Sequence, residues 1–285
     1  MIDIKSKATG EVLFSVDSDT LVGADFKNVN LRGADLSDKD LRHADFYRAN
    51  LTEADLSNSQ LQFADFTGAR LNNSNLLGAD LSRAIFSSGR ATGAATMQGA
   101  NLRQTIMLGT MLDFVNLQEA NFNDADLSYA SLKEADLSHA DFTDADLCEA
   151  VFNRANLSQC NLKNTDLCGA HFNNANLTQA ILDKAELSGE ITQQPANFTL
   201  ATLEDASMIG AHMARAIFKN CNMEQAIMRE ADLTDAIIDG AMIKSADVAG
   251  ANFSGVRLTT ASLQYSNFSK ARNANIPANK QANLR

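Results

Sequence analysis

The sequence lacks the residues that mark several classes of protein. Tryptophan is absent, only 2 prolines occur, and 15 glycines in 285 residues are too few for a collagen. The 4 cysteines are too few for a disulfide scaffold, and no CxxC pair points to a zinc or redox site. No stretch reaches 18 consecutive apolar residues, and the first residues lack the apolar core of a signal peptide. We therefore expect a folded cytoplasmic protein with reduced thiols.

What the chain has in abundance is a five-residue repeat. Large apolar residues recur at every fifth position from Leu21 to Phe86, from Met97 to Leu187 and from Phe198 to Phe268. A small residue, most often Ala, stands two positions before each of these central residues, with Asp19 and Lys39 as exceptions. A period of five fits neither the 3.6-residue turn of a helix nor the alternation of a strand. It predicts a chain that turns a corner after every five residues.

Four such pentads close a square coil of twenty residues, in which the central residue and the small residue both point inward. Successive coils then stack as parallel strands about 4.8 Å apart. Lys39 stands at an inward position, which predicts a local bulge or an acidic neighbour that neutralises its charge. Phenylalanines at central positions repeat at intervals of twenty, and we expect them to stack in ladders: Phe26, Phe46, Phe66 and Phe86, Phe122 with Phe142, and Phe152 with Phe172.

Many pentads share a core of Ala, an Asp or Asn, and a large apolar residue, as in Ala24-Asp25-Phe26, Ala34-Asp35-Leu36 and Ala135-Asp136-Leu137. This core resembles the A(D/N)LXX consensus of the pentapeptide repeat family, over about residues 19–270. The resemblance implies an all-β fold, a right-handed quadrilateral β-helix, which agrees with the square coil and would have about 12 coils here. The family includes quinolone-resistance and toxin-immunity proteins that act on DNA gyrase, so the fold alone does not imply one function.

The repeat divides the chain into three predicted regions. Residues 1–18 alternate in a way that predicts a hairpin, which would cap the N-terminal end of the stack. Residues 19–270 form the β-helix, with interruptions near 87–96 and 188–197. Residues 271–285 lose the repeat, and we expect a tail, a C-terminal cap or a segment that pairs one end of the rod with a second copy of the chain.

Acidic residues are concentrated in the middle of the chain. A hydrophobic content of 45% excludes a long disordered acidic chain despite the net charge of −11. Residues 96–190 carry 14 acidic and 5 basic side chains. Four carboxylates directly precede central leucines twenty residues apart, and the square coil predicts that they form one column: Asp126, Asp146, Asp166 and Glu186. The column either mimics the regular charge of duplex DNA toward a basic enzyme surface, or follows from the repeat consensus and keeps the protein soluble.

Further candidate residues lie in the interruptions and at two cysteines. Departures from a regular repeat are the places most free to bind a partner, although tolerated insertions explain them equally. The partner-binding candidates in the interruptions are Arg90, Thr92, Glu190, Gln193 and Gln194. Cys148 and Cys168 each follow a central leucine and are twenty residues apart, so we expect stacked thiols that face outward on adjacent coils. They are either free or joined in a disulfide.

The sequence points away from catalysis. No two histidines are twenty residues apart, and none has a Cys or Ser partner at a fixed spacing. We expect no catalytic residues, no metal and no cofactor. The acidic charge argues against direct binding of nucleic acid, and no membrane segment is expected. The leading prediction is a non-catalytic scaffold that binds another protein; the alternative is a DNA-mimic modulator of DNA gyrase or topoisomerase.

Overall fold

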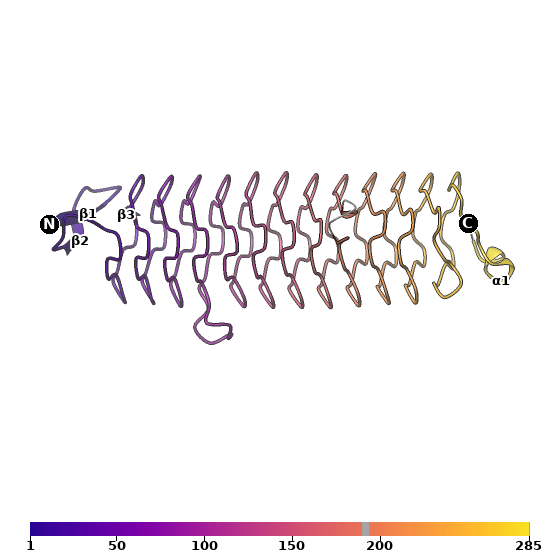
Figure 1. Cartoon of the computed structure of the whole chain (residues 1–285), viewed down its shortest axis with the longest axis horizontal. Helices are drawn as coiled ribbons and strands as arrows, with labels where there is room; N and C mark the ends of the chain where they lie inside the picture. Colours follow the sequence, from indigo (N-terminus) through magenta and orange to yellow (C-terminus); the bar gives the residue numbers. More distant parts are fainter. Residues whose placement is uncertain (190–193, 285) are drawn as a thin grey trace. The chain divides into compact units, whose positions relative to one another are not determined.

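The computed structural model describes residues 1–189 and 194–284. The chain forms two compact units, Met1–Phe142 (unit 1) and Thr143–Arg285 (unit 2), and both are built from the same five-residue turn (Figure 1). In the described part, no helix is long and apolar enough to cross a membrane.

Parallel bridges between residues twenty positions apart define the architecture of each unit. Bridges of this kind run from Asp25 to Asp141 in unit 1 and from Asp146 to Arg272 in unit 2. Each involves a single residue of the pentad, because the backbone turns again on both sides of it. Phe26 N–H donates to the carbonyl of Asp45 at 2.8 Å, and Asp45 N–H donates to Ala24 at 2.9 Å. The twenty-residue period expected from the sequence is therefore present in both units.

A tight turn follows the central residue of a regular pentad. The carbonyl of Leu21 accepts the N–H of Ala24 at 3.1 Å, and Gly23 between them has a φ of 68°. The equivalent residue of most pentads also has a positive φ without being glycine, such as Asn28 at 58° and His43 at 59°. Asp or Asn before the central residue supports the turn, since Asp25 Oδ1 accepts the N–H of Lys27 at 3.0 Å. The acidic consensus position thus has a structural use.

An antiparallel hairpin begins unit 1. Strand β1 (Ile2–Ser6) pairs with β2 (Val12–Val16) on one side and with β3 (Ala34–Asp35) on the other, giving the order β2-β1-β3. The Lys7 ammonium reaches the carboxylate of Asp55, which bridges Asp35 of β3. This ion pair joins the hairpin to the coil that follows β3. The hairpin therefore extends the hydrogen-bonding edge of the first coil instead of leaving it unpaired.

A short helix ends the described chain. Helix α1 (Ala278–Gln281) follows the last repeat-like bridge, between Asn252 and Arg272. Its Lys280 ammonium donates to the carbonyls of Leu258 at 3.0 Å and Thr259 at 2.7 Å, and also to Ala261. The helix is thereby attached to the final coil through main-chain acceptors. The boundaries 1–18, 19–270 and 271–285 themselves stay predictions.

The residues on either side of each interruption are joined by the same kind of backbone hydrogen bond. Ala95 N–H donates to Phe86 at 2.9 Å, and Ala196 N–H donates to Leu187 at 2.9 Å, so each insertion is closed at its base. Figure 1 shows the first insertion projecting from the stacked coils of unit 1. Bridges across an insertion join residues 26 positions apart instead of twenty, as between Arg70 and Thr96. Each insertion therefore shifts the register by six residues.

Stacked phenylalanines fill the core. Ring centroids in the first ladder are 4.8–4.9 Å apart from Phe26 to Phe86, with nearly parallel planes. Phe122 and Phe142 stack at 4.5 Å in unit 1. In unit 2 the pair expected from the sequence, Phe152 and Phe172, continues past the insertion through two further rings: Phe198 and Phe218.

One core expectation is wrong. Lys39 does not point inward but is exposed, and its carbonyl accepts the N–H of Gln60 at 2.9 Å. The backbone pairing between coils is kept while the ammonium stays in water, because an unpaired charge in the core would cost more than one missing small side chain.

The stacked rings predict a large loss of stability on truncation. Phe66 is fully buried between two rings, so Phe66→Ala should lower the free energy of unfolding by about 3–5 kcal/mol. Urea denaturation followed by circular dichroism measures this. Phe63→Ala is the matched control, because Phe63 is 46% exposed and its ring contacts two surface side chains, His43 and Arg83, instead of core phenylalanines. Equal losses for the two variants would show that the ladder is not the source of stability.

Candidate functional site

One outward-facing series in unit 2 brings several predicted residues together. Asp146, Asp166 and Glu186, here called the acidic column, are joined by parallel bridges on successive coils. The series continues to His212 and Asp232, and His212 Nδ1 lies 3.3 Å from Glu186 Oε2. Sequence reasoning missed both because it counted in twenties across the second insertion. Adding the six-residue shift to 186 + 20 gives 212 and would have found the pair.

The fourth predicted member of the column, Asp126, belongs to unit 1. It bridges Ile106 there, and its Oδ1 accepts the N–H of Ser128 at 2.9 Å. Within unit 1, Asp126 therefore has an apolar neighbour on its own face rather than another carboxylate.

Each member of the acidic column also supports a turn. Asp146 Oδ1 accepts the N–H of Cys148 at 2.9 Å, and Asp166 Oδ1 accepts that of Cys168 at 3.0 Å. Glu186 Oε1 does the same for Ser188 at 2.9 Å. One oxygen of each carboxylate is thus committed to the backbone, and the second oxygen remains for other contacts.

The charges in the column are not equally compensated. Partial removal from water raises the pKa of Asp166, the N–H of Cys168 opposes this, and the charges of Asp146 and Glu186 raise it further. Burial acts the same way on Asp232, but there hydrogen bonds from its neighbours and the charge of His212 bring the pKa below its ordinary value. Asp166 therefore has less favourable surroundings for its charge than Asp232 has.

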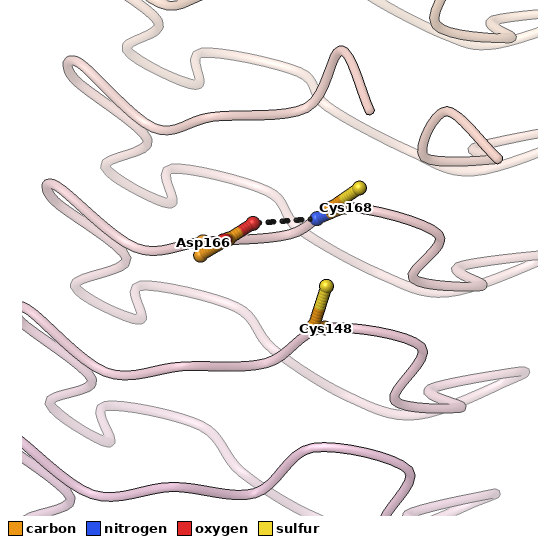
Figure 2. A group of neighbouring side chains, drawn as sticks. All are labelled: Cys148, Asp166 and Cys168. Atoms are coloured by element: carbon orange, nitrogen blue, oxygen red, sulfur yellow. Dashed lines mark hydrogen bonds between the residues drawn. The ribbon is translucent and has the colours of Figure 1, made fainter. Parts of the chain in front are cut away.

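Two thiols lie beside Asp166. Figure 2 shows Cys148, Asp166 and Cys168 on adjacent coils, with the bond from the Cys168 N–H to Asp166. Their ligand atoms, two sulfurs and a carboxylate oxygen, all lie within 4.8 Å of one another. Both cysteines carry thiol groups rather than the disulfide that the spacing also allowed. The expectation that both thiols face outward is wrong for Cys168, which is only 3% exposed. The second insertion covers it, since its Sγ contacts the carbonyl of Gln194 at 3.7 Å.

The environment of Cys148 disfavours its thiolate. Partial burial, followed by the negative charge of Asp166, raises the pKa of the Cys148 thiol from 9.0 to about 12. A free thiolate is therefore scarce at neutral pH, and spontaneous nucleophilic chemistry at this sulfur is disfavoured.

The partner-binding candidates in the two interruptions belong to different units. Arg90 and Thr92 are exposed on the first insertion, in unit 1. Gln194 is exposed in unit 2, and its backbone carbonyl contacts the Cys168 thiol. Glu190 and Gln193 lie outside the described residues.

An apolar surface in unit 1 was missed by the sequence reasoning. Ile106, Leu108 and Met111 are 45%, 40% and 41% exposed and belong to one coil. Met111 bridges Ile85, which is also apolar. They lie in two neighbouring ladders of the coils, since Ile106 bridges Asp80 and Asp126 whereas Met111 bridges Ile85 and Ser131. We call these four residues the apolar patch. The signal was available, because Ile85, Ile106 and Met111 occupy the outward position where the repeat normally has Asp or Asn.

The repeated pentads match a known protein family. The sequence matches the family described as pentapeptide repeats in 8 copies, which together span most of the chain: residues 24–61, 59–94, 94–128, 116–154, 130–167, 150–189, 196–235 and 236–272. The chain belongs to the pentapeptide repeat family. This confirms the resemblance carried by the Ala-Asp-Leu pentads.

Solved structures of pentapeptide repeat proteins are similar to the chain. HetL, a pentapeptide repeat protein involved in heterocyst differentiation regulation from the cyanobacterium Nostoc sp. strain PCC 7120, is 30% identical, with a TM-score of 0.50, over 84% of this chain and 92% of HetL. QnrB1, a plasmid-mediated fluoroquinolone resistance protein, is 15% identical over 79% of this chain and 85% of its own, with a TM-score of 0.27. Rfr23 from the cyanobacterium Cyanothece 51142 is 18% identical over 60% of this chain and 91% of its own, with a TM-score of 0.24. No curated protein matches the sequence.

The shielded thiol of this pentapeptide repeat protein predicts slow alkylation. At pH 8, native Cys148 should react with iodoacetamide at least about tenfold more slowly than in the urea-denatured chain, because its raised pKa leaves little thiolate. Peptide mass spectrometry over time measures the rate. Asp166→Asn removes one repelling charge and should speed the reaction, while Asp232→Asn should not. A native rate equal to the denatured rate would contradict this account.

Proposed function

We propose that this pentapeptide repeat protein is a non-catalytic, cytoplasmic scaffold that binds another protein. In this proposal its coils form the right-handed quadrilateral β-helix expected from the repeat, with about 12 coils and flat outer faces. Repeat solenoids offer extended rigid surfaces that suit protein contacts, since each coil contributes a few side chains to a continuous face.

The apolar patch is the observation that carries this proposal. At these positions the repeat tolerates Asp and Asn, which are soluble and support the turn, yet this coil has Ile and Met instead. Removing exposed apolar side chains from water lowers the free energy, and binding of a partner achieves this. Apolar residues are enriched at the centre of protein interfaces, so Ile106, Leu108 and Met111 are candidates for such contacts.

The first insertion lies next to the apolar patch. Phe86 N–H donates to the carbonyl of Met111 at 2.9 Å, and the insertion begins at the following residue. Its exposed Arg90 and Thr92 are polar and project from the coil. A partner seated on the patch would thus meet an apolar centre with a polar edge, which is the usual composition of an interface.

The chemistry of the patch favours a protein partner. A chain with a net charge of −11 lacks the basic surface that phosphate contacts require, so direct binding of nucleic acid is not proposed. Because HetL is described as involved in regulation of heterocyst differentiation, we propose that the contact with the partner has a regulatory role. A homodimer through one end of the stack is a further form of the same proposal.

A DNA-mimic modulator of DNA gyrase or topoisomerase is the second candidate. The observation that favours it is the acidic column, whose three carboxylates repeat on successive coils. Two features weaken it: His212 follows directly in the same series, and each carboxylate already supports a turn. The repeat thus accounts for the column without a DNA-binding enzyme.

Replacement of the apolar patch tests the scaffold. Ile106→Asn combined with Met111→Asn restores the polar residue common at these positions, so folding should be kept while capture of the partner from an extract of the source organism falls at least about tenfold. Quantitative mass spectrometry of proteins held by the immobilised full chain measures this. Leu200→Asn is the control, since Leu200 is 52% exposed in unit 2. Unchanged capture by the double variant would contradict the proposal.

A supercoiling assay with purified gyrase distinguishes the second candidate. The DNA mimic requires inhibition, or protection against a quinolone, that is weakened by salt and lost in Asp146→Lys combined with Asp166→Lys. The apolar patch variants should then behave as the wild type. We expect no effect on gyrase from the unaltered chain.

A further inference from the structure

Cys148, Asp166 and Cys168 form a compact group of metal-ligating atoms. The two sulfurs and the carboxylate oxygen lie within 4.8 Å of one another on two adjacent coils of unit 2 (Figure 2). In a tetrahedral zinc site with bonds of about 2.0–2.3 Å, ligand atoms are separated by somewhat less than this. The side chains therefore need only a small rotation to reach a common ion.

The backbone holds this group in place. Parallel stacking puts Cys148 and Cys168 at equivalent positions of successive coils, as the bridge between Asp146 and Asp166 shows. The bond from the Cys168 N–H fixes one oxygen of Asp166 and leaves the other oxygen available. Asp166 and Cys168, two residues apart, are thus positioned by the same turn.

The surroundings favour a cation. Asp146 and Glu186 lie on the coils before and after Asp166, and no lysine or arginine among the described residues forms an ion pair with Asp146 or Asp166. Glu149 packs over the glycine that follows Cys168, because a Cβ on Gly169 would lie only 2.6 Å from the Glu149 carboxylate. Negative charge thus gathers around the thiols, and of these carboxylates Glu186 has His212 beside it.

We propose that Cys148, Asp166 and Cys168 bind one thiophilic divalent ion, for which Zn²⁺ is the probe. Two thiolates and a carboxylate are a ligand set suited to Zn²⁺, whereas Ca²⁺ and Mg²⁺ require mainly oxygen ligands. On binding, each thiol releases its proton to the solvent and water completes the tetrahedron. Cys148 is partly exposed and provides the route of entry, while the buried Cys168 and the Gln194 carbonyl close the other side.

An ion at this place would join two coils. Binding to the folded state alone raises stability as the ion concentration exceeds the dissociation constant. The proposal therefore predicts a rise in melting temperature on addition of Zn²⁺, which the Ala variant of either cysteine loses.

Titration of the reduced, chelator-treated full chain tests the site. With a chromophoric chelator as competitor, the wild type should bind one equivalent of Zn²⁺, and Cd²⁺ should produce a sulfur-to-metal charge-transfer band. Cys148→Ala should abolish the band and weaken Zn²⁺ binding at least about tenfold. Asp166→Asn should weaken binding while keeping the turn, because Asn156 and Asn176 make the same bond at 3.3 and 3.1 Å.

Cys160→Ala is the matched control. Cys160 is buried at the inward position where most pentads have Ala, so its loss should leave Zn²⁺ binding unchanged. The proposal is overturned if the wild type binds no Zn²⁺ below millimolar concentration, or if Cys148→Ala binds as well as the wild type. A third outcome also overturns it: Asp146→Asn weakens Zn²⁺ binding as much as Cys148→Ala does, and Cd²⁺ gives no charge-transfer band with the wild type. The carboxylates of the acidic column would then be the ligands.

Discussion

The tight turn after the central residue of each regular pentad is the constraint on which the structure depends. The turn requires a residue with a positive φ, the left-handed backbone conformation, at a fixed position of the pentad. The side chain of an Asp or Asn stabilises the turn by accepting a backbone N–H. Because the turn recurs every five residues, the backbone presents its N–H and C=O groups along the stacking direction, and the next coil satisfies them. The inward pair of one large and one small residue then follows from the narrow space that remains. Core, turn and hydrogen bonding are thus three aspects of one local geometry.

Stacking in register has consequences for chemistry at the surface. Whatever residue occupies one outward position lies about 4.8 Å from its equivalent on the next coil. Phenylalanines form ladders in this way, and so do carboxylates, whose adjacent charges repel by about 0.9 kcal/mol at the dielectric of water. The same rule places Cys148 beside Cys168 and Glu186 beside His212. A solenoid of this kind builds a site from residues far apart in the sequence without a pocket, and only their register decides which ones meet.

The insertions show how register limits inference. Up to Leu187, counting in twenties places every bridge of unit 2 correctly, and the Phe152–Phe172 pair was found in this way. Only for the bridges that cross the second insertion is the spacing 26 residues, which hid the continuation of that ladder and the contact of His212 with Glu186. The second insertion also covers Cys168, so a thiol expected at the surface is buried. A short loop thus changed both the partner of one residue and the exposure of another.

The sequence by itself determined the repeat, the family, the inward residues and the first phenylalanine ladder, because all of these depend on a local period that each pentad restates. The candidate site was visible in part: Asp146, Asp166, Glu186 and the two cysteines were placed by the same period. Only the tertiary structure decided that Cys168 is buried, that Lys39 turns outward and how far Ile106, Leu108 and Met111 are exposed. These features depend on how a loop folds back, or on which side chains remain in water. Both are set by neighbouring coils rather than by the pentad itself.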